Sequence, residues 1–204
     1  MIKRILGTIT GILLAFNVFA GSATFDFTDP SGVSNLSFDM TAPVESISGS
    51  ADGISGSIDF DPAKPEATNG TISVETKSLM VPKAKMRDHI MGSMWMEANK
   101  YPEMTFEFSG VSGIQSAGED VFKGQAKGTM MVKGVAKELN AEVTIKHLAG
   151  KLGAKLPGKK GDLLVVTGAF VVKRDAFSIN AGQKLDKVAN DIHIGLNLIG
   201  YSEK

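Results

Sequence analysis

Cysteine is absent from the 204-residue sequence. Its absence excludes disulfide bonds, thiolate metal sites, a cysteine nucleophile and lipid attachment through an N-terminal cysteine. Histidine is scarce, and no two of the three histidines have the spacing of metal ligands. The sequence therefore predicts no bound metal and no cofactor. It also predicts one domain whose stability comes from a single hydrophobic core and not from cross-links.

An excess of charge of one sign is also missing. The 22 basic residues equal the 22 acidic residues, so the formal net charge is zero. A chain with no basic excess is not expected to bind nucleic acid or anionic membrane surfaces. Lys151, Lys155, Lys159 and Lys160 lie among glycine and proline, and we expect them to form a solvated loop.

Catalytic motifs are lacking as well. No G-x-S-x-G nucleophile elbow occurs beside a suitable base. The glycines of residues 53–56 precede a further strand and not a helix, so they do not form a phosphate loop. Asp88 and His89 are adjacent on a predicted helix and therefore point in different directions. We expect no enzymatic activity.

A long apolar run occurs once, at the N-terminus. Met1–Arg4 is positively charged, Ile5–Phe19 is almost wholly apolar or small, and modest side chains precede the bond after Ala20. This run is shorter than the roughly 20 residues that span a bilayer. The layout predicts a signal peptide over residues 1–20. We therefore expect a periplasmic or secreted protein with a barrel domain over residues 24–204 and no stable membrane insertion after cleavage.

The rest of the sequence contains short runs in which apolar and polar residues alternate. A period of two places successive side chains on opposite faces, which is typical of strands with one buried face. Many short strands separated by Asp, Pro, Gly and Ser turns predict an antiparallel sandwich or barrel. In the nearly continuous run 163–172, the odd-numbered residues from Leu163 to Val171 are assigned to one face. The runs lie at 36–40, 54–60, 72–74, 104–108, 139–145, 163–172 and 192–198.

One stretch has helical spacing instead. Met86, Ile90 and Met94 recur at four-residue intervals within residues 83–99, and Pro82 precedes them. We expect one amphipathic helix that covers an open end of the barrel. The irregular stretch 148–163 is expected to be a mobile hairpin connection or a rim loop at the mouth. Methionine is concentrated around the helix, where it either adapts to a ligand or fills gaps in the core.

Several stretches together resemble the YceI-like family, in order and spacing, over essentially the whole mature chain. The resemblance implies an all-β, eight-stranded antiparallel lipocalin-like barrel with one helix, between the fourth and fifth strands. It also implies that a long isoprenoid or fatty amphiphile lies inside the barrel. The stretches are Arg87–Asp88, Ser93, Lys100–Phe106, Gly128–Leu139, Lys173–Ile179 and Val188–Ile194.

Three departures from the family pattern affect its polar contacts. The histidine that family members often carry near residues 40–42 is absent. Ile90 stands where the family's helix histidine usually lies, and Trp95 replaces a common acidic residue. These changes predict a more apolar helix face and a ligand that is different or more hydrophobic.

The leading hypothesis is an exported binding protein that carries or stores a long apolar amphiphile. The alternative is an accessory or interaction module whose barrel is filled by its own side chains; a homodimer is left open. Arg87, Asp88, Arg174 and Asp175 are interpreted as structural. The candidate ligand-binding residues face inward or cap the mouth: Phe38, Met40, Ile58, Phe60, Met86, Ile90, Met94, Trp95, Phe106, Phe108, Phe170 and Phe177.

Overall fold

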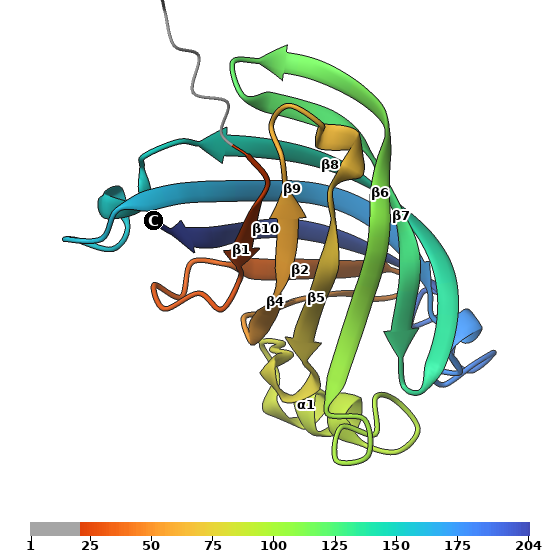
Figure 1. Ribbon diagram of the computed structural model, residues 1–204. Coiled ribbons are helices and arrows are strands. Elements are labelled where there is room, and N and C mark those ends of the chain that lie inside the picture. Colours follow the sequence, from red (N-terminus) through yellow and green to blue (C-terminus); the bar gives the residue numbers. More distant parts are fainter. Residues whose placement is uncertain (1–20) are drawn as a thin grey trace, which may run out of the picture.

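The computed structural model describes residues 21–204, and the predicted signal peptide lies outside the described residues. Figure 1 shows a strongly twisted barrel with one α-helix, α1 (Ala84–Met91), at one end. Four single-turn 3-10 helices lie at Pro65–Ala67, Thr76–Ser78, Leu152–Ala154 and Asp175–Phe177. The strands are β1 (Ala23–Asp26), β2 (Asn35–Thr41), β3 (Ser46–Ala51), β4 (Ile54–Phe60), β5 (Asn69–Glu75), β6 (Glu103–Gly118), β7 (Val121–Val132), β8 (Val135–Leu148), β9 (Gly161–Lys173) and β10 (Asp191–Glu203).

These strands fill eight positions of a closed antiparallel barrel, which confirms the predicted fold. β1 and β2 both pair with β10, at Asp26↔Tyr201 and at Asn35↔Asn197, and so form one interrupted strand. β3 and β4 form the next interrupted strand, because β3 pairs with β2 and β4 pairs with β1. Consecutive pairings from β4 to β10 close the barrel. The helix follows β5, the third position, so its expected place between the fourth and fifth strands is wrong.

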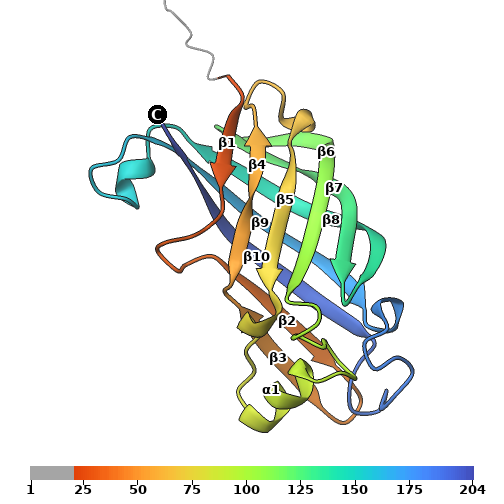
Figure 2. The ribbon, with the colours of Figure 1, turned by 60° about the horizontal axis from the view of Figure 1, so that its bottom comes forward.

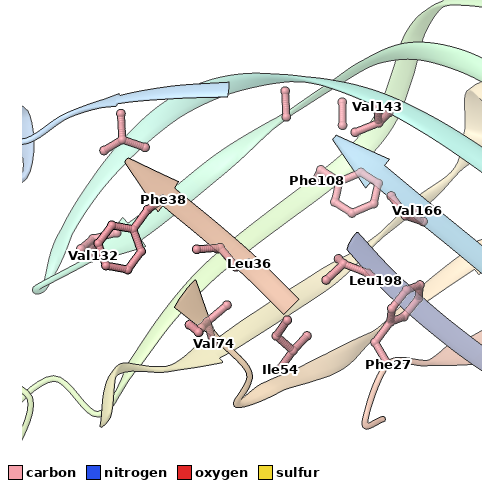
Figure 3. Packing of buried hydrophobic residues seen from close by; sticks show 14 of the residues in the cluster. Phe27, Leu36, Phe38, Ile54, Val74, Phe108, Val132, Val143, Val166 and Leu198 are labelled. Atoms are coloured by element: carbon pink, nitrogen blue, oxygen red, sulfur yellow. The ribbon is translucent and has the colours of Figure 1, made fainter. Parts of the chain in front are cut away.

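Alternation of apolar and polar residues decides which side chains fill the barrel. In β2, Leu36, Phe38 and Met40 are buried and the residues between them are exposed. Figure 3 shows buried side chains from several strands converging on the interior. The face predicted for β9 is wrong over its second half, because Val166 and Val172 are buried while Val171 is exposed. A continuous apolar run does not indicate a face, and a shift of one residue inverts the prediction.

The predicted helix 83–99 is only half helical. α1 ends at Met91, and residues 92–99 form turns that lie over the barrel end. Gly92 is a poor helix former and follows the last helical residue. Beyond it, buried residues are not three or four positions apart, as they would be on one face of a helix. Met96 and Ala98, two residues apart, are both buried. Tertiary packing therefore determines this segment beyond the helix.

The two ends of the barrel differ. At the helix end, α1 and its following turns lie beside the loop 174–190, as Figure 2 shows. At the opposite end, called here the far end, lie the C-terminus and the connection between β8 and β9. That connection is not a rim loop at the helix end. Leu152 is fully buried in a second cluster with Leu163, Ile199 and Tyr201, which anchors the connection to the barrel.

Arg174 organises the loop 174–190. Its side chain is fully buried and, among the described residues, forms no ion pair with a carboxylate. Its guanidinium instead donates hydrogen bonds to five backbone carbonyls of the loop, and it lies 5.5 Å from the centroid of the Trp95 ring. The interpretation of Arg174 as structural is consistent with these contacts. The acceptors are the carbonyl oxygens of Ala189, Ile179, Asn180, Gln183 and Val188.

The loop between β1 and β2 depends on one carboxylate, Asp29. Backbone amides of Ser31, Val33 and Ser34 donate to it, as do the hydroxyls of Ser31 and Tyr201. Burial alone would raise the pKa of Asp29, but these hydrogen bonds lower it well below its usual value. The ionised carboxylate therefore stabilises the folded protein.

We expect acid to remove this stabilisation. Because the folded pKa of Asp29 lies below the unfolded pKa of about 3.9, its contribution is complete above about pH 5 and is lost progressively as the pH falls from there toward the lower, folded pKa. Urea denaturation from pH 7 to pH 2.5 should show this loss. Asp29→Asn should be less stable at pH 7 and should have a shallower acid slope. An unchanged acid slope in Asp29→Asn would contradict the assignment.

Candidate functional site

The barrel encloses two adjoining apolar cavities. The one nearer the helix end, called here the outer cavity, has a volume of about 100 Å³. The one nearer the far end, the inner cavity, has a volume of about 90 Å³. Leu36, Met104 and Met130 line both cavities and lie between them. An enclosed apolar cavity tends to stay free of water and can take up small apolar molecules.

The outer cavity lies against the segment that covers the helix end. Ile90 of α1, and Trp95 and Met96 of the following turns, line it together with residues of β2, β7, β9 and β10. No residue that lines this cavity is charged or carries a hydroxyl or amide side chain. Ile90 and Trp95 are two of the positions at which the family pattern led us to expect polar groups. The outer cavity therefore offers a ligand contact with apolar groups.

An aromatic cluster closes the inner cavity toward the far end. The ring centroid of Phe60 lies 6.5 Å from that of Phe25, 5.9 Å from that of Phe122 and 5.7 Å from that of His147. Phe25 and Phe60 are almost completely buried. None of these four residues lines either cavity, so the cluster (Phe25, Phe60, Phe122 and His147) forms a floor below the inner cavity.

The floor is held by a buried polar group. Nε2 of His147 lies 3.3 Å from the carboxylate of Asp162, which also accepts from the backbone amide of Gly150 and pairs with Lys204 at 2.7 Å. Burial alone would raise the pKa of Asp162, but its hydrogen bonds from Lys204, Gly150 and His147 lower it. These contacts tie the C-terminus to the connection between β8 and β9. His147 lies two residues beyond Ile145, so extending the alternating run 139–145 would have placed it on the buried face.

Eight of the twelve predicted site residues line the cavities. Their ligand contacts stay a prediction; six of them lie on strands of the barrel and two in the segment that covers its helix end. Phe38, Met40, Ile90 and Trp95 line the outer cavity. Ile58, Phe106, Phe108 and Phe170 line the inner cavity.

The other four residues lie elsewhere. Met94 was expected to face inward, but its side chain is 64% exposed because the helix ends before it. Met86 packs on the outside of the core, beside Ile47 and Pro82. Phe60 belongs to the floor, and Phe177 is buried in the core beside the loop 174–190. None of these four lines the outer or the inner cavity.

Sequence reasoning missed many residues that line the cavities. Leu36, Met104, Val143 and Ile194 belong to alternating runs that were recognised, so extending the face of each run would have found them. Met130 lacked such a signal because Met131, of the same type, follows it directly. Val166 lies on the same face of β9 as Phe170, which was predicted, so extending that face would have found it.

Residues 21–204 contain neither a metal-binding cluster nor a membrane-spanning helix. This part of the chain contains no cluster of three or more His, Cys, Asp or Glu residues placed to hold a metal ion. None of its helices combines the length and the hydrophobicity needed to cross a membrane.

Comparison with known proteins gives a consistent result. A family model described as the YceI-like domain matches residues 28–199. A UPF0312 protein of Azotobacter vinelandii is 34% identical over 82 residues, which is 40% of this chain and 40% of that protein. The aligned region thus spans less than half the length of this curated relative.

Solved structures share the fold. The structure of BcnA from Burkholderia cenocepacia has a TM-score of 0.66 at 23% identity and covers 81% of this chain and 95% of that chain. A polyisoprenoid binding domain from Saccharophagus degradans, implicated in plant cell wall breakdown, has a TM-score of 0.63 at 14% identity, over 88% of this chain and 98% of that chain. Because the family model matches most of its length, this chain belongs to the family of YceI-like domains.

Proposed function

We propose that this protein binds a long apolar amphiphile, a polyisoprenoid or similar lipid, inside the barrel and carries or stores it without chemical change. The observation that supports this most directly is the pair of adjoining apolar cavities. The polyisoprenoid-binding domain with the same fold also supports it. Each buried CH₂ group contributes roughly 0.8 kcal/mol, so a long chain binds without specific polar contacts.

The ligand enters at the helix end in this proposal. The far end is closed by the aromatic floor, whereas the outer cavity lies directly below α1 and the turns that follow it. Three side chains that are more than half exposed, Val44, Met94 and Leu185, lie in segments at this end. Any polar group of the ligand remains at the helix end, because the lining of the outer cavity offers it no partner.

Both cavities are far smaller than the about 300–1,000 Å³ of typical ligand pockets. Entry of a long chain therefore requires lining side chains to move apart. Such movement costs little free energy where the lining residue is methionine, because its thioether side chain is flexible. The methionines that line the cavities are Met40, Met96, Met104 and Met130.

We propose further that the protein is exported to the periplasm or secreted, as the pattern of residues 1–20 indicates. Purification from the periplasmic fraction of a bacterial host tests export and binding together. The intact mass should correspond to a chain that begins at Gly21. Extraction of the same preparation with organic solvent, followed by mass spectrometry, should yield an apolar molecule in near-stoichiometric amount.

Trp95 gives a second readout, because it is the only tryptophan of the chain and lines the outer cavity. Addition of farnesol to delipidated protein should change the intensity or wavelength of its emission in a saturable manner. An empty extract together with an unchanged emission would refute binding.

The small cavity volumes favour a second candidate, an accessory or interaction module whose barrel is nearly filled by its own side chains. That candidate predicts the same negative result in both experiments. It also predicts that adding farnesol leaves the thermal unfolding midpoint unchanged, whereas a ligand that binds only the folded state raises it.

A further inference from the structure

The three residues shared by the two cavities differ in stiffness. Leu36 is branched and buried, whereas Met104 and Met130 are unbranched and half-buried. Met104 lies on β6 and Met130 on β7, and the register Phe106↔Met130 places them on neighbouring strands. A methionine side chain has three rotatable bonds and adapts its shape at little cost. The boundary between the cavities is therefore movable on one side and rigid on the other.

The cavities have a fixed order along the barrel. A chain that enters at the helix end meets the outer cavity, then Met104 and Met130, then the inner cavity, and finally the aromatic floor. The floor is fixed because Phe60 is packed between Phe25, Phe122 and His147. The depth available to a chain thus depends on the positions of two methionine side chains.

We propose that Met104 and Met130 form a movable partition that selects ligands by the length of their apolar chain. This inference rests on the proposed function. A short chain fills the outer cavity and leaves the partition in place. A longer chain displaces the two thioethers, joins the cavities and gains affinity from the additional surface that it buries.

The test compares linear isoprenoid alcohols of increasing length: geraniol, farnesol and geranylgeraniol. Affinities are measured by Trp95 emission for the wild type and for two double variants at Met104 and Met130. The variant Met104→Leu with Met130→Leu keeps the side-chain volume but is stiffer, so it is expected to fold normally. The variant Met104→Ala with Met130→Ala removes the partition.

The quantity compared is the ratio of the Kd for geraniol to the Kd for geranylgeraniol. The double leucine variant should lower this ratio by at least about tenfold, because the long chain no longer reaches the inner cavity. The double alanine variant should raise it, since the long chain enters without displacing side chains. Met131→Leu is the matched control, because Met131 follows Met130 but points outward and is 39% exposed. Its ratio should equal that of the wild type.

Nuclear magnetic resonance of ¹³C-labelled methionine methyl groups provides an independent readout. Geranylgeraniol should shift the Met104 and Met130 signals strongly, and geraniol should shift them weakly. The partition is refuted if the wild type binds all three alcohols and the ratio is the same in every variant. Failure of the wild type to bind any of the alcohols would instead refute the proposed function, and the partition with it.

Discussion

Replacement of Arg174 by methionine is expected to lower the free energy of unfolding by at least about 3 kcal/mol. Methionine replaces the apolar stem of arginine but has no donors, so five backbone carbonyls of the loop 174–190 lose their partner at once. A buried polar group left without a partner costs about 1–3 kcal/mol. Some of the loop carbonyls regain water when the loop opens, which keeps the total below the sum of five such costs.

Neutral groups contact the buried positive charge of Arg174. Burial lowers the pKa of the guanidinium, and the negative charge of Asp175 offsets this only in part. The backbone carbonyls and the Trp95 ring are therefore the groups that compensate for its desolvation. Lysine has one nitrogen and three donors, so Arg174→Lys is expected to recover only part of the stability.

Urea denaturation of the variants beside the wild type measures the effect. Lys173→Met is the matched control, because Lys173 is the preceding residue and forms an exposed ion pair with Asp191 at 2.9 Å. This change should have little effect on stability, because an exposed ion pair contributes little. A cost for Arg174→Met as small as that for Lys173→Met would show that the loop does not depend on the guanidinium.

The function proposed here is affected by the same change. Ile179, whose carbonyl accepts from Arg174, lines the outer cavity, and so does Trp95. Opening of the loop therefore removes a wall of the outer cavity. Emission of Trp95 in Arg174→Met should shift toward that of a solvent-exposed tryptophan even without ligand.

The sequence predicted the barrel well because alternation is a local signal. Each half-buried strand shows its buried face in its own residues, as β2 does with Leu36, Phe38 and Met40. The prediction was wrong where that signal disappears. In β9 the run is apolar on both faces near its start, because the connection between β8 and β9 covers the outside with Leu152.

The site was harder to predict than the fold. A cavity is defined by what the side chains leave empty, and this depends on contacts between residues far apart in sequence. Ile58 and Phe60 lie on the same face of β4, but only Ile58 lines a cavity, because Phe25, Phe122 and His147 surround Phe60. Met94 satisfied the helical period and is nonetheless exposed, since the helix ends three residues before it.

The contrast between Phe60 and Phe106 leads to the second large expected effect. Phe60 is 1% exposed and packed on all sides, so Phe60→Ala is expected to lower the free energy of unfolding by about 3–5 kcal/mol. Phe106 is half-buried, stacks on Phe108 at 5.7 Å and borders the inner cavity. It has fewer contacts to lose, so Phe106→Ala should cost about 1–2 kcal/mol.

Phe60→Ala should have the larger effect on stability, but Phe106→Ala should have the larger effect on ligand binding. Phe106 lines the inner cavity and Phe60 does not, so Phe106→Ala should weaken binding of geranylgeraniol more than Phe60→Ala does. Phe60→Ala adds space below the inner cavity, which accommodates the end of a long chain and offsets part of its lost stability when ligand is bound. Urea denaturation measures the stability of the two variants, and titration followed by Trp95 emission measures their affinity for geranylgeraniol. If Phe60→Ala weakens both stability and long-chain binding more than Phe106→Ala does, the aromatic cluster is part of the ligand-contacting wall and the inner cavity does not end above it.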